Sequence, residues 1–209
     1  MNVSFFLDRY QKASVFVPFR RRMDVLSTWM NLIKLMISYY PPSQPQIAAK
    51  VVLKVSKMSR VFFVSNNQTS SLAFPFHVEI EEERTVVRTF SGREIDSRIS
   101  SDILALVAVL QDRPVLDAWD FLEFSDQSGE LSDDFWPVFS ELIDAEDGYL
   151  RFDHDPKNQK GHLHPLDHAD LFYTNGAKFK LGLDKTLDIE EVISMLDVET
   201  DCHYLTLKK

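Results

Sequence analysis

Residues 149–181, YLRFDHDPKNQKGHLHPLDHADLFYTNGAKFKL, hold the pattern that decides the fold class. Residues 149–153 predict a strand, and the polar residues 154–165 predict a loop. Asn175-Gly176 supplies the positive φ angles of a type I′ turn, so the flanking residues 170–174 and 177–181 predict a β-hairpin. Hairpin strands pair antiparallel, so this stretch indicates an antiparallel sheet.

Further strands are predicted on both sides of this stretch. Residues 60–65 (RVFFVS) are apolar and β-branched, whereas residues 66–71 are polar and predict a loop. A second hairpin is expected from residues 76–80 and 85–90, with the acidic EEER as its turn. A final short strand is expected over residues 204–207.

Helices are predicted where apolar residues recur every three or four positions. Residues 24–40 predict one helix and residues 43–58 a second, and the prolines between them indicate an antiparallel helical hairpin. Four more helices are expected later in the chain. They are a helix capped by Ser100 or Ser101, a short helix over residues 115–124, one after Ser132, and one capped by Asp188 with Glu191 in a capping box.

These elements predict a single α+β domain over residues 1–209. The expected fold is an N-terminal helical hairpin followed by a mostly antiparallel sheet with packed helices. Residues 1–59 are a candidate helical subdomain, and residues 149–209 form a C-terminal part rich in histidine and aspartate.

Charge is spread unevenly along the chain. The 209 residues carry a formal net charge of −9, but residues 1–60 carry +8, residues 61–150 carry −14 and residues 151–209 carry −3. Arg20, Arg21 and Arg22 lie beside aromatic residues in the basic segment, a combination that suits a nucleic-acid backbone. The alternative is a solvated face that balances the acidic middle, and the acidic whole-chain charge weighs against nucleic acid.

The sequence also bounds the compartment. The one cysteine, Cys202, excludes an intramolecular disulfide and agrees with a reducing compartment. The first residues lack the basic start and apolar core of a signal peptide, and no apolar run is long enough to span a bilayer. We therefore expect a cytoplasmic protein without membrane contact, and its oligomeric state stays open.

Several common catalytic motifs are absent. The chain has no GxxxxGK[ST], GxGxxG, GxSxG or CxxC. This argues against a glycine-rich phosphate loop, a hydrolase nucleophile elbow and a paired-cysteine redox or zinc site.

Four of the six histidines fall within residues 154–168, among several aspartates. Imidazole and carboxylate are the usual acid/base groups near neutral pH, so His164 and His168 are candidate catalytic residues with Asp153 and Asp155 as orienting carboxylates. A structural or binding role is an alternative. If a divalent metal is bound, the candidate ligands are His162, His164 and His168, although no cofactor is favoured.

The C-terminal part resembles an uncharacterised prokaryotic family of unknown function with an RFDYDP…HPxxH-type signature. The resemblance covers the chain from about residue 150 onward and rests on RFDHDP, HPLDH, the hairpin and the closing helix. The matching positions are Arg151, Asp153, Asp155, Pro156, His164, Pro165 and His168. His154 replaces the family's aromatic residue, and only Lys178 and Lys180 stand where relatives carry an arginine.

Members of that family often lie near phage-defence, restriction or toxin genes. The resemblance therefore implies a component of a prokaryotic antiviral defence or toxin–antitoxin system that acts through a protein partner from the same locus. Arg151, Arg20, Arg21 and Arg22 are the candidate binding residues. The alternative is a nuclease or other phosphodiester-acting enzyme that uses the His/Asp cluster, so enzymatic activity and nucleic-acid binding both stay open.

Overall fold

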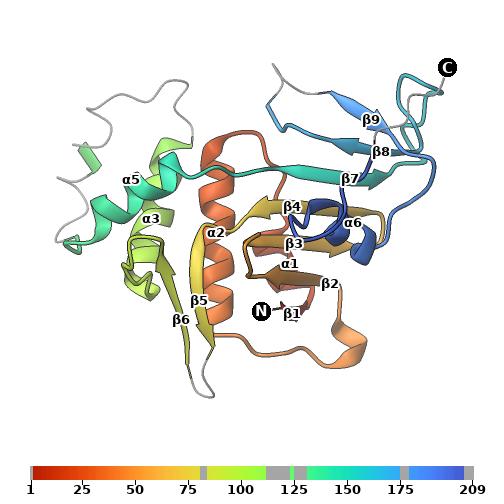
Figure 1. Cartoon of the computed structure of the whole chain (residues 1–209). Coiled ribbons are helices and arrows are strands. Elements are labelled where there is room, and N and C mark those ends of the chain that lie inside the picture. Colours follow the sequence, from red (N-terminus) through yellow and green to blue (C-terminus); the bar gives the residue numbers. More distant parts are fainter. Residues whose placement is uncertain (1, 81–83, 112–122, 125–130, 175–178, 205–209) are drawn as a thin grey trace.

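The computed structural model describes the chain except for residues 1, 81–83, 112–122, 125–130, 175–178 and 205–209. Its main feature is a seven-stranded sheet in the order β1-β2-β3-β4-β7-β8-β9, in which every pairing is antiparallel (Figure 1). The strands are β1 (Asn2–Leu7), β2 (Ala49–Lys54), β3 (Arg60–Ser65), β4 (Gln68–Ala73), β7 (Leu150–His154), β8 (Asp167–Asp170) and β9 (Lys180–Gly182). A separate hairpin pairs β5 (Phe76–Ile80) with β6 (Thr85–Thr89).

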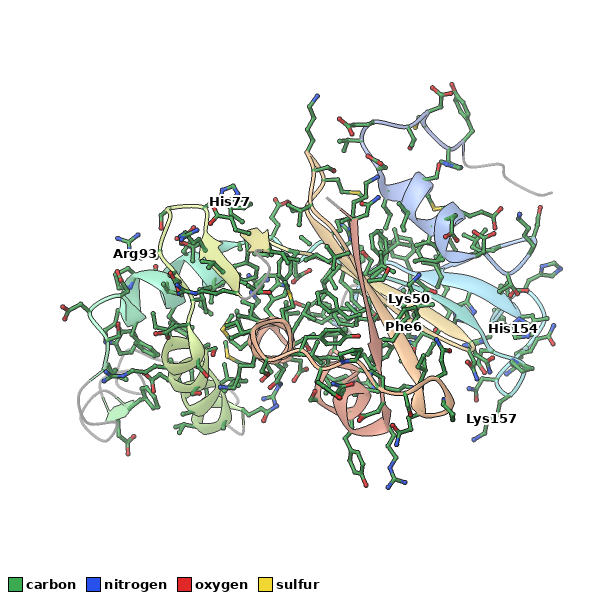
Figure 2. All side chains as sticks on the ribbon, turned by 90° about the horizontal axis from the view of Figure 1, so that it is seen from below. Phe6, Lys50, His77, Arg93, His154 and Lys157 are labelled. Atoms are coloured by element: carbon green, nitrogen blue, oxygen red, sulfur yellow. The ribbon has the colours of Figure 1, made fainter. Side chains whose placement is uncertain are left out.

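Helices cover both faces of the main sheet. The described helices are α1 (Arg9–Val15), α2 (Arg22–Ile37), α3 (Ser97–Leu110), α5 (Phe135–Asp144) and α6 (Ile189–Leu196), with a short 3-10 turn η1 (Gln44–Gln46). Figure 2 shows the sheet between α6 on one side and α1 on the other. Antiparallel strands with packed helices confirm the predicted α+β class.

The hydrophobic core has two parts, one on each face of the main sheet, because side chains alternate between the faces along each strand. Val51 and Phe63 belong to the larger core together with α1 and α2. Their neighbours Val52 and Phe62 point to the other face and form a smaller core with Phe152 and α6. Because side chains alternate along a strand, the central strands are buried on both faces.

The larger core continues beyond the sheet. It extends through α2 to α3, α5 and the β5–β6 hairpin, which lie on the far side of α2 from the sheet (Figure 1). The Trp29 side chain of α2 lies at this junction, where its indole N–H donates to the Ala73 carbonyl and its ring meets Phe76 edge-on. Helix α2 therefore joins the two halves of the molecule.

The predicted N-terminal helical hairpin is wrong. The first helix exists as α2, but residues 49–54 of the predicted second helix form strand β2, paired with β1 and β3. Val51, Val52 and Leu53 are all buried, which a one-sided helix does not achieve and a strand covered on both faces does. Residues 1–59 are consequently not a helical subdomain, because they supply two strands of the main sheet.

The predicted loop over residues 66–71 is also wrong. Most of it belongs to β4, whose Thr69, Ser70 and Ser71 are buried between β3 and β7. Polar residues made this strand resemble a loop, but the two neighbouring strands satisfy its backbone groups.

The predicted strand over residues 170–174 is misplaced, because β8 spans Asp167–Asp170 and residues 171–173 belong to no strand. The other local predictions fare better. The strand over residues 60–65, the hairpin of β5 and β6, and the capping box of Asp188 and Glu191 are confirmed. The helix α3 exists, but its cap is Asp96 rather than Ser100 or Ser101. The Asn175-Gly176 turn, and nearly all of the short helix over 115–124 and of the strand over 204–207, lie outside the described residues.

Within the described ranges, no helix combines the length and the apolar character that crossing a bilayer requires.

Candidate functional site

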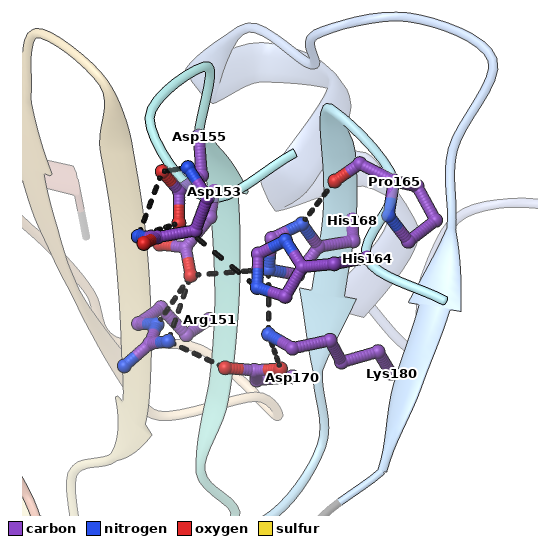
Figure 3. A network of polar contacts seen from close by, with 9 residues as sticks. Arg151, Asp153, Asp155, His164, Pro165, His168, Asp170 and Lys180 are labelled. Carbon is purple, nitrogen blue, oxygen red and sulfur yellow. Dashed lines mark hydrogen bonds and ion pairs between the residues drawn. The ribbon is translucent and has the colours of Figure 1, made fainter. Parts of the chain in front are cut away.

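A polar cluster lies on one face of the sheet, where β7, β8 and β9 extend beyond α1 and α2 (Figure 1). The register sets Arg151 opposite Asp170, Asp153 opposite His168, and Asp170 opposite Lys180. Residues two apart in a strand share a face, so these five side chains project together. We call these five residues the polar cluster (Figure 3).

Asp170 lies at the centre of the polar cluster and is only 1% exposed. Its carboxylate accepts a hydrogen bond from Arg151 Nη2, and its other oxygen lies 2.8 Å from Lys180 Nζ. Arg151 also donates from Nε to Asp153 Oδ2 over 2.8 Å. A buried carboxylate is costly unless it is paired, and here two cations offset that cost.

Arg151 holds its charge strongly in this setting. Burial alone would lower its pKa, but Tyr149 and the carboxylates of Asp153 and Asp170 outweigh burial, so the pKa of Arg151 is raised. The two carboxylates also fix the plane of the guanidinium.

The proton on one ring nitrogen of His168 follows from its neighbours. His168 is fully buried, and its Nδ1 lies 2.9 Å from the Pro165 carbonyl oxygen, which only accepts hydrogen bonds. Its Nε2 lies 2.7 Å from Lys180 Nζ, and an ammonium only donates. The Pro165 carbonyl therefore assigns a proton to Nδ1, while Nε2 faces both Lys180 Nζ and, at 3.5 Å, Asp153 Oδ2.

His164 closes the polar cluster at one end. Its ring meets that of His168 edge-on, with the centroids 4.6 Å apart, and its Nε2 lies 4.0 Å from Asp155 Oδ2. Its Nδ1 is buried and has no hydrogen-bond partner within the described chain. Asp155 accepts hydrogen bonds from Asn158, which keep the pKa of Asp155 below its usual value.

The structure brings together four of the predicted catalytic residues but not the predicted histidine metal set. His164 and His168 are in contact, and Asp153 and Asp155 lie beside them. His162 is exposed on the loop, and no contact of its side chain with this group is found in the described ranges.

A different donor set does converge. One ligand atom each from Asp153, His168 and Asp170 lies within 4.8 Å of the others, and carboxylate and imidazole suit a divalent cation. Lys180 Nζ, however, lies within hydrogen-bond distance of His168 and Asp170. A metal ion would fit these donors only after Lys180 moved away, so the arrangement as it stands does not fit one.

The arginine run divides between two environments. Arg22 turns inward, where it pairs with Asp147 at 3.2 Å and donates to the carbonyl oxygens of Leu142 and Ala145 near the end of α5. Arg20 and Arg21 are exposed, and within the described chain their side chains form no ion pair.

An aromatic contact places the start of the arginine run, residues 20–22, near β7. The ring of Phe19 lies 5.5 Å from that of Tyr149, which is two residues from Arg151 in β7. The backbone of Arg20 and Arg21 therefore follows a residue that lies near β7. Arg22, in contrast, links α2 to the end of α5 through its hydrogen bonds. The sequence contains no local signal for this proximity, because more than a hundred residues separate the two segments.

Asp170 and Lys180 were missed as site residues. Asp170 lies two residues after His168 in β8, the same spacing as Arg151 and Asp153 in β7, but the predicted strand begins only at residue 170 and so does not include His168. The pairing of Lys180 with Asp170 depends on the hairpin register, which spacing alone does not reveal.

No family model matches this chain, and searches of the curated proteins and of the solved structures found no match.

Proposed function

We propose that the protein is a non-catalytic, cytoplasmic component of a prokaryotic defence or toxin-linked system and that it acts by binding a protein partner. The proposal that the protein is non-catalytic rests on one observation: the polar groups of the polar cluster are buried or half-buried and already paired with one another. His168 has no exposed surface, and each of its ring nitrogens has a hydrogen-bond partner. The Asp170 carboxylate is paired with Arg151 and Lys180.

The histidine geometry argues against metal-independent acid/base hydrolysis of a phosphodiester. A general acid or base must reach its proton within about 3 Å, and in-line displacement needs the two groups on opposite sides of phosphorus. The rings of His164 and His168 touch each other, so no phosphoryl group fits between them. We infer that these histidines hold the loop over β8 rather than transfer protons.

The proposed partner surface lies at the β9 end of the sheet. Among the described strands β9 is the last in the sheet order, and Phe172 and Phe179 are exposed on the segments that join it to β8. Their rings lie 5.8 Å apart, and the exposed Leu163 lies on the adjoining loop. Aromatic anchors beside an open strand edge are typical of protein-binding surfaces.

The test is co-purification from the native host followed by mass spectrometry. We expect one protein, encoded next to this gene, to be retained by the wild type and lost from a Phe172→Ser, Phe179→Ser double variant. Phe90→Ser is the control, because Phe90 is also an exposed phenylalanine but lies on the other half of the molecule. Retention of no neighbouring gene product, or equal retention by the double variant, would contradict the proposal.

A metal-dependent phosphodiester-acting enzyme is the second candidate, and the converging donors of Asp153, His168 and Asp170 favour it. On this reading Lys180 leaves the donors when a metal binds. Elemental analysis after incubation with Mn²⁺ or Zn²⁺, with nuclease assays on single-stranded DNA and RNA, tests it. Stoichiometric metal and cleavage that Asp170→Asn abolishes would support this candidate, and a metal-free, inactive wild type would remove it.

A further inference from the structure

A cavity of about 180 Å³ lies between strands β4 and β7 and the segment that joins α1 to α2. Its apolar wall is formed by residues 15–19. Its polar wall is formed by Gln68, Ser70, Tyr149 and Arg151. This volume is below the roughly 300 Å³ of a typical small-molecule pocket, so it suits a group of ionic size.

Two polar side chains of β4 face this cavity without partners. Ser70 is only 9% exposed, and its hydroxyl forms no hydrogen bond within the described chain. The side-chain amide of Gln68 is likewise without a hydrogen bond among the described residues. Neither group is fully enclosed by protein, so the Ser70 hydroxyl and the Gln68 amide reach the open space of the cavity. Both groups are therefore available to a ligand.

Arg151 supplies the positive charge on the cavity wall. Its Nε and Nη2 atoms are used by Asp153 and Asp170, but Nη1 contacts neither carboxylate. Figure 3 shows this remaining nitrogen of Arg151 directed away from both carboxylates. The register places Ser70 directly opposite Arg151 across the β4–β7 pair. The two carboxylates thus hold the guanidinium in place, and the Tyr149 side chain on the cavity wall also hydrogen-bonds to Arg151.

The other lining groups also favour an anion. Burial raises the pKa of Tyr149 to about 12, so its hydroxyl keeps its proton and can donate at neutral pH. No aspartate or glutamate lines the cavity within the described chain. A guanidinium with hydroxyl and amide donors matches the oxygen atoms of a phosphate group.

We propose that this cavity binds the phosphate group of a nucleotide. The nucleotide is favoured over free phosphate because Phe16 and Phe19 contribute aromatic surface beside the cavity, and bases stack on such side chains. Arg20 and Arg21 directly follow Phe19 of the cavity wall in the chain, and both are exposed. This site goes beyond the partner-binding function proposed above and does not depend on it.

The test is isothermal titration calorimetry at low ionic strength with inorganic phosphate, a nucleoside monophosphate and acetate as probes. The wild type should bind the nucleoside monophosphate more tightly than phosphate, and phosphate more tightly than acetate. Ser70→Val replaces the hydroxyl on the polar wall with methyl groups. Arg151→Lys replaces the planar guanidinium with an ammonium group. Each variant should weaken phosphate binding by roughly tenfold or more, the usual effect of losing a hydrogen bond to a charged group.

Thr69→Val is the matched control, because Thr69 precedes Ser70 in β4 and points to the opposite face of the sheet. It should bind phosphate as the wild type does, and a melting curve for each variant verifies folding. The proposal is overturned if the wild type shows no saturable phosphate binding, or if Ser70→Val and Arg151→Lys, both folded, bind as tightly as Thr69→Val. Equal affinity for phosphate and the nucleoside monophosphate would overturn the nucleotide assignment.

Discussion

The Nζ atom of Lys180 lies 2.7 Å from Nε2 of His168 and 2.8 Å from a carboxylate oxygen of Asp170. A lysine on β9 therefore satisfies a fully buried imidazole and a nearly buried carboxylate on β8. These contacts add to the backbone pairing of the short strand β9 with β8.

Lys180→Met is expected to lower the free energy of unfolding by about 2 kcal/mol, since it leaves buried acceptors on His168 and Asp170 without this donor. Arg151 still pairs with Asp170, so the variant should fold. Urea unfolding measures the change. Lys185→Met is the control and should stay within about 0.5 kcal/mol, because the Lys185–Glu191 pair is exposed. Equal losses for the two variants would refute the role of Lys180.

Tyr149 predicts a loss of stability in alkaline solution. Burial raises its pKa to about 12, whereas a phenol in the unfolded chain has a pKa of about 10. Between these values the native state keeps a proton that the unfolded state has lost, so the free energy of unfolding falls as pH rises. Below about pH 10 both states are protonated and this contribution is fully present.

The measurement is urea unfolding at about pH 9 and about pH 11.5. The wild type should lose about 1–2 kcal/mol more than Tyr149→Phe over this interval. Tyr40→Phe, which alters an exposed tyrosine, should behave as the wild type does. The same pH dependence in Tyr149→Phe as in the wild type would show that another group is responsible.

The arginine run supplies a matched pair of variants. Arg22→Met removes an ion pair to Asp147 and donors to two carbonyl oxygens, and it should lower the free energy of unfolding by about 2 kcal/mol. Arg21→Met removes an exposed side chain and should change it by less than about 0.5 kcal/mol. Thermal melting of the two proteins side by side checks this, and a reversed order would contradict the inward orientation of Arg22.

The cap of α6 should have a measurable effect. Asp188 Oδ1 accepts from the Glu191 backbone N–H over 2.8 Å, and the Glu191 carboxylate accepts from the Asp188 backbone N–H over 3.1 Å. Asp188→Ala should lower the free energy of unfolding by about 1 kcal/mol. Asp201→Ala, an exposed aspartate outside any helix, is the control. If chemical denaturation gives the two variants the same stability, the cap does not hold α6 in place.

Local patterns predicted the elements whose signals are contained within a few residues. Helix α2, the capped helix α6, strand β3 and the β5–β6 hairpin follow from periodicity, caps and turn residues. Strands β2 and β4 do not. Strand β2 is buried on both faces, so its apolar run resembles a helix, and β4 is polar, so it resembles a loop.

In the candidate site, too, some features can be read from local spacing and others depend on contacts between distant segments. The spacing of two between Arg151 and Asp153, and between His168 and Asp170, can be read from the chain, and it puts each pair on one face because side chains of a strand alternate between its faces. Which of these side chains meet and which face water depends on how distant segments pack. The hairpin register set Lys180 against Asp170, and the packing of Phe19 on Tyr149 brought the arginine run to β7. Such contacts join residues far apart in the chain, and they form only where burial and pairing in the complete fold offset the entropy of bringing those segments together.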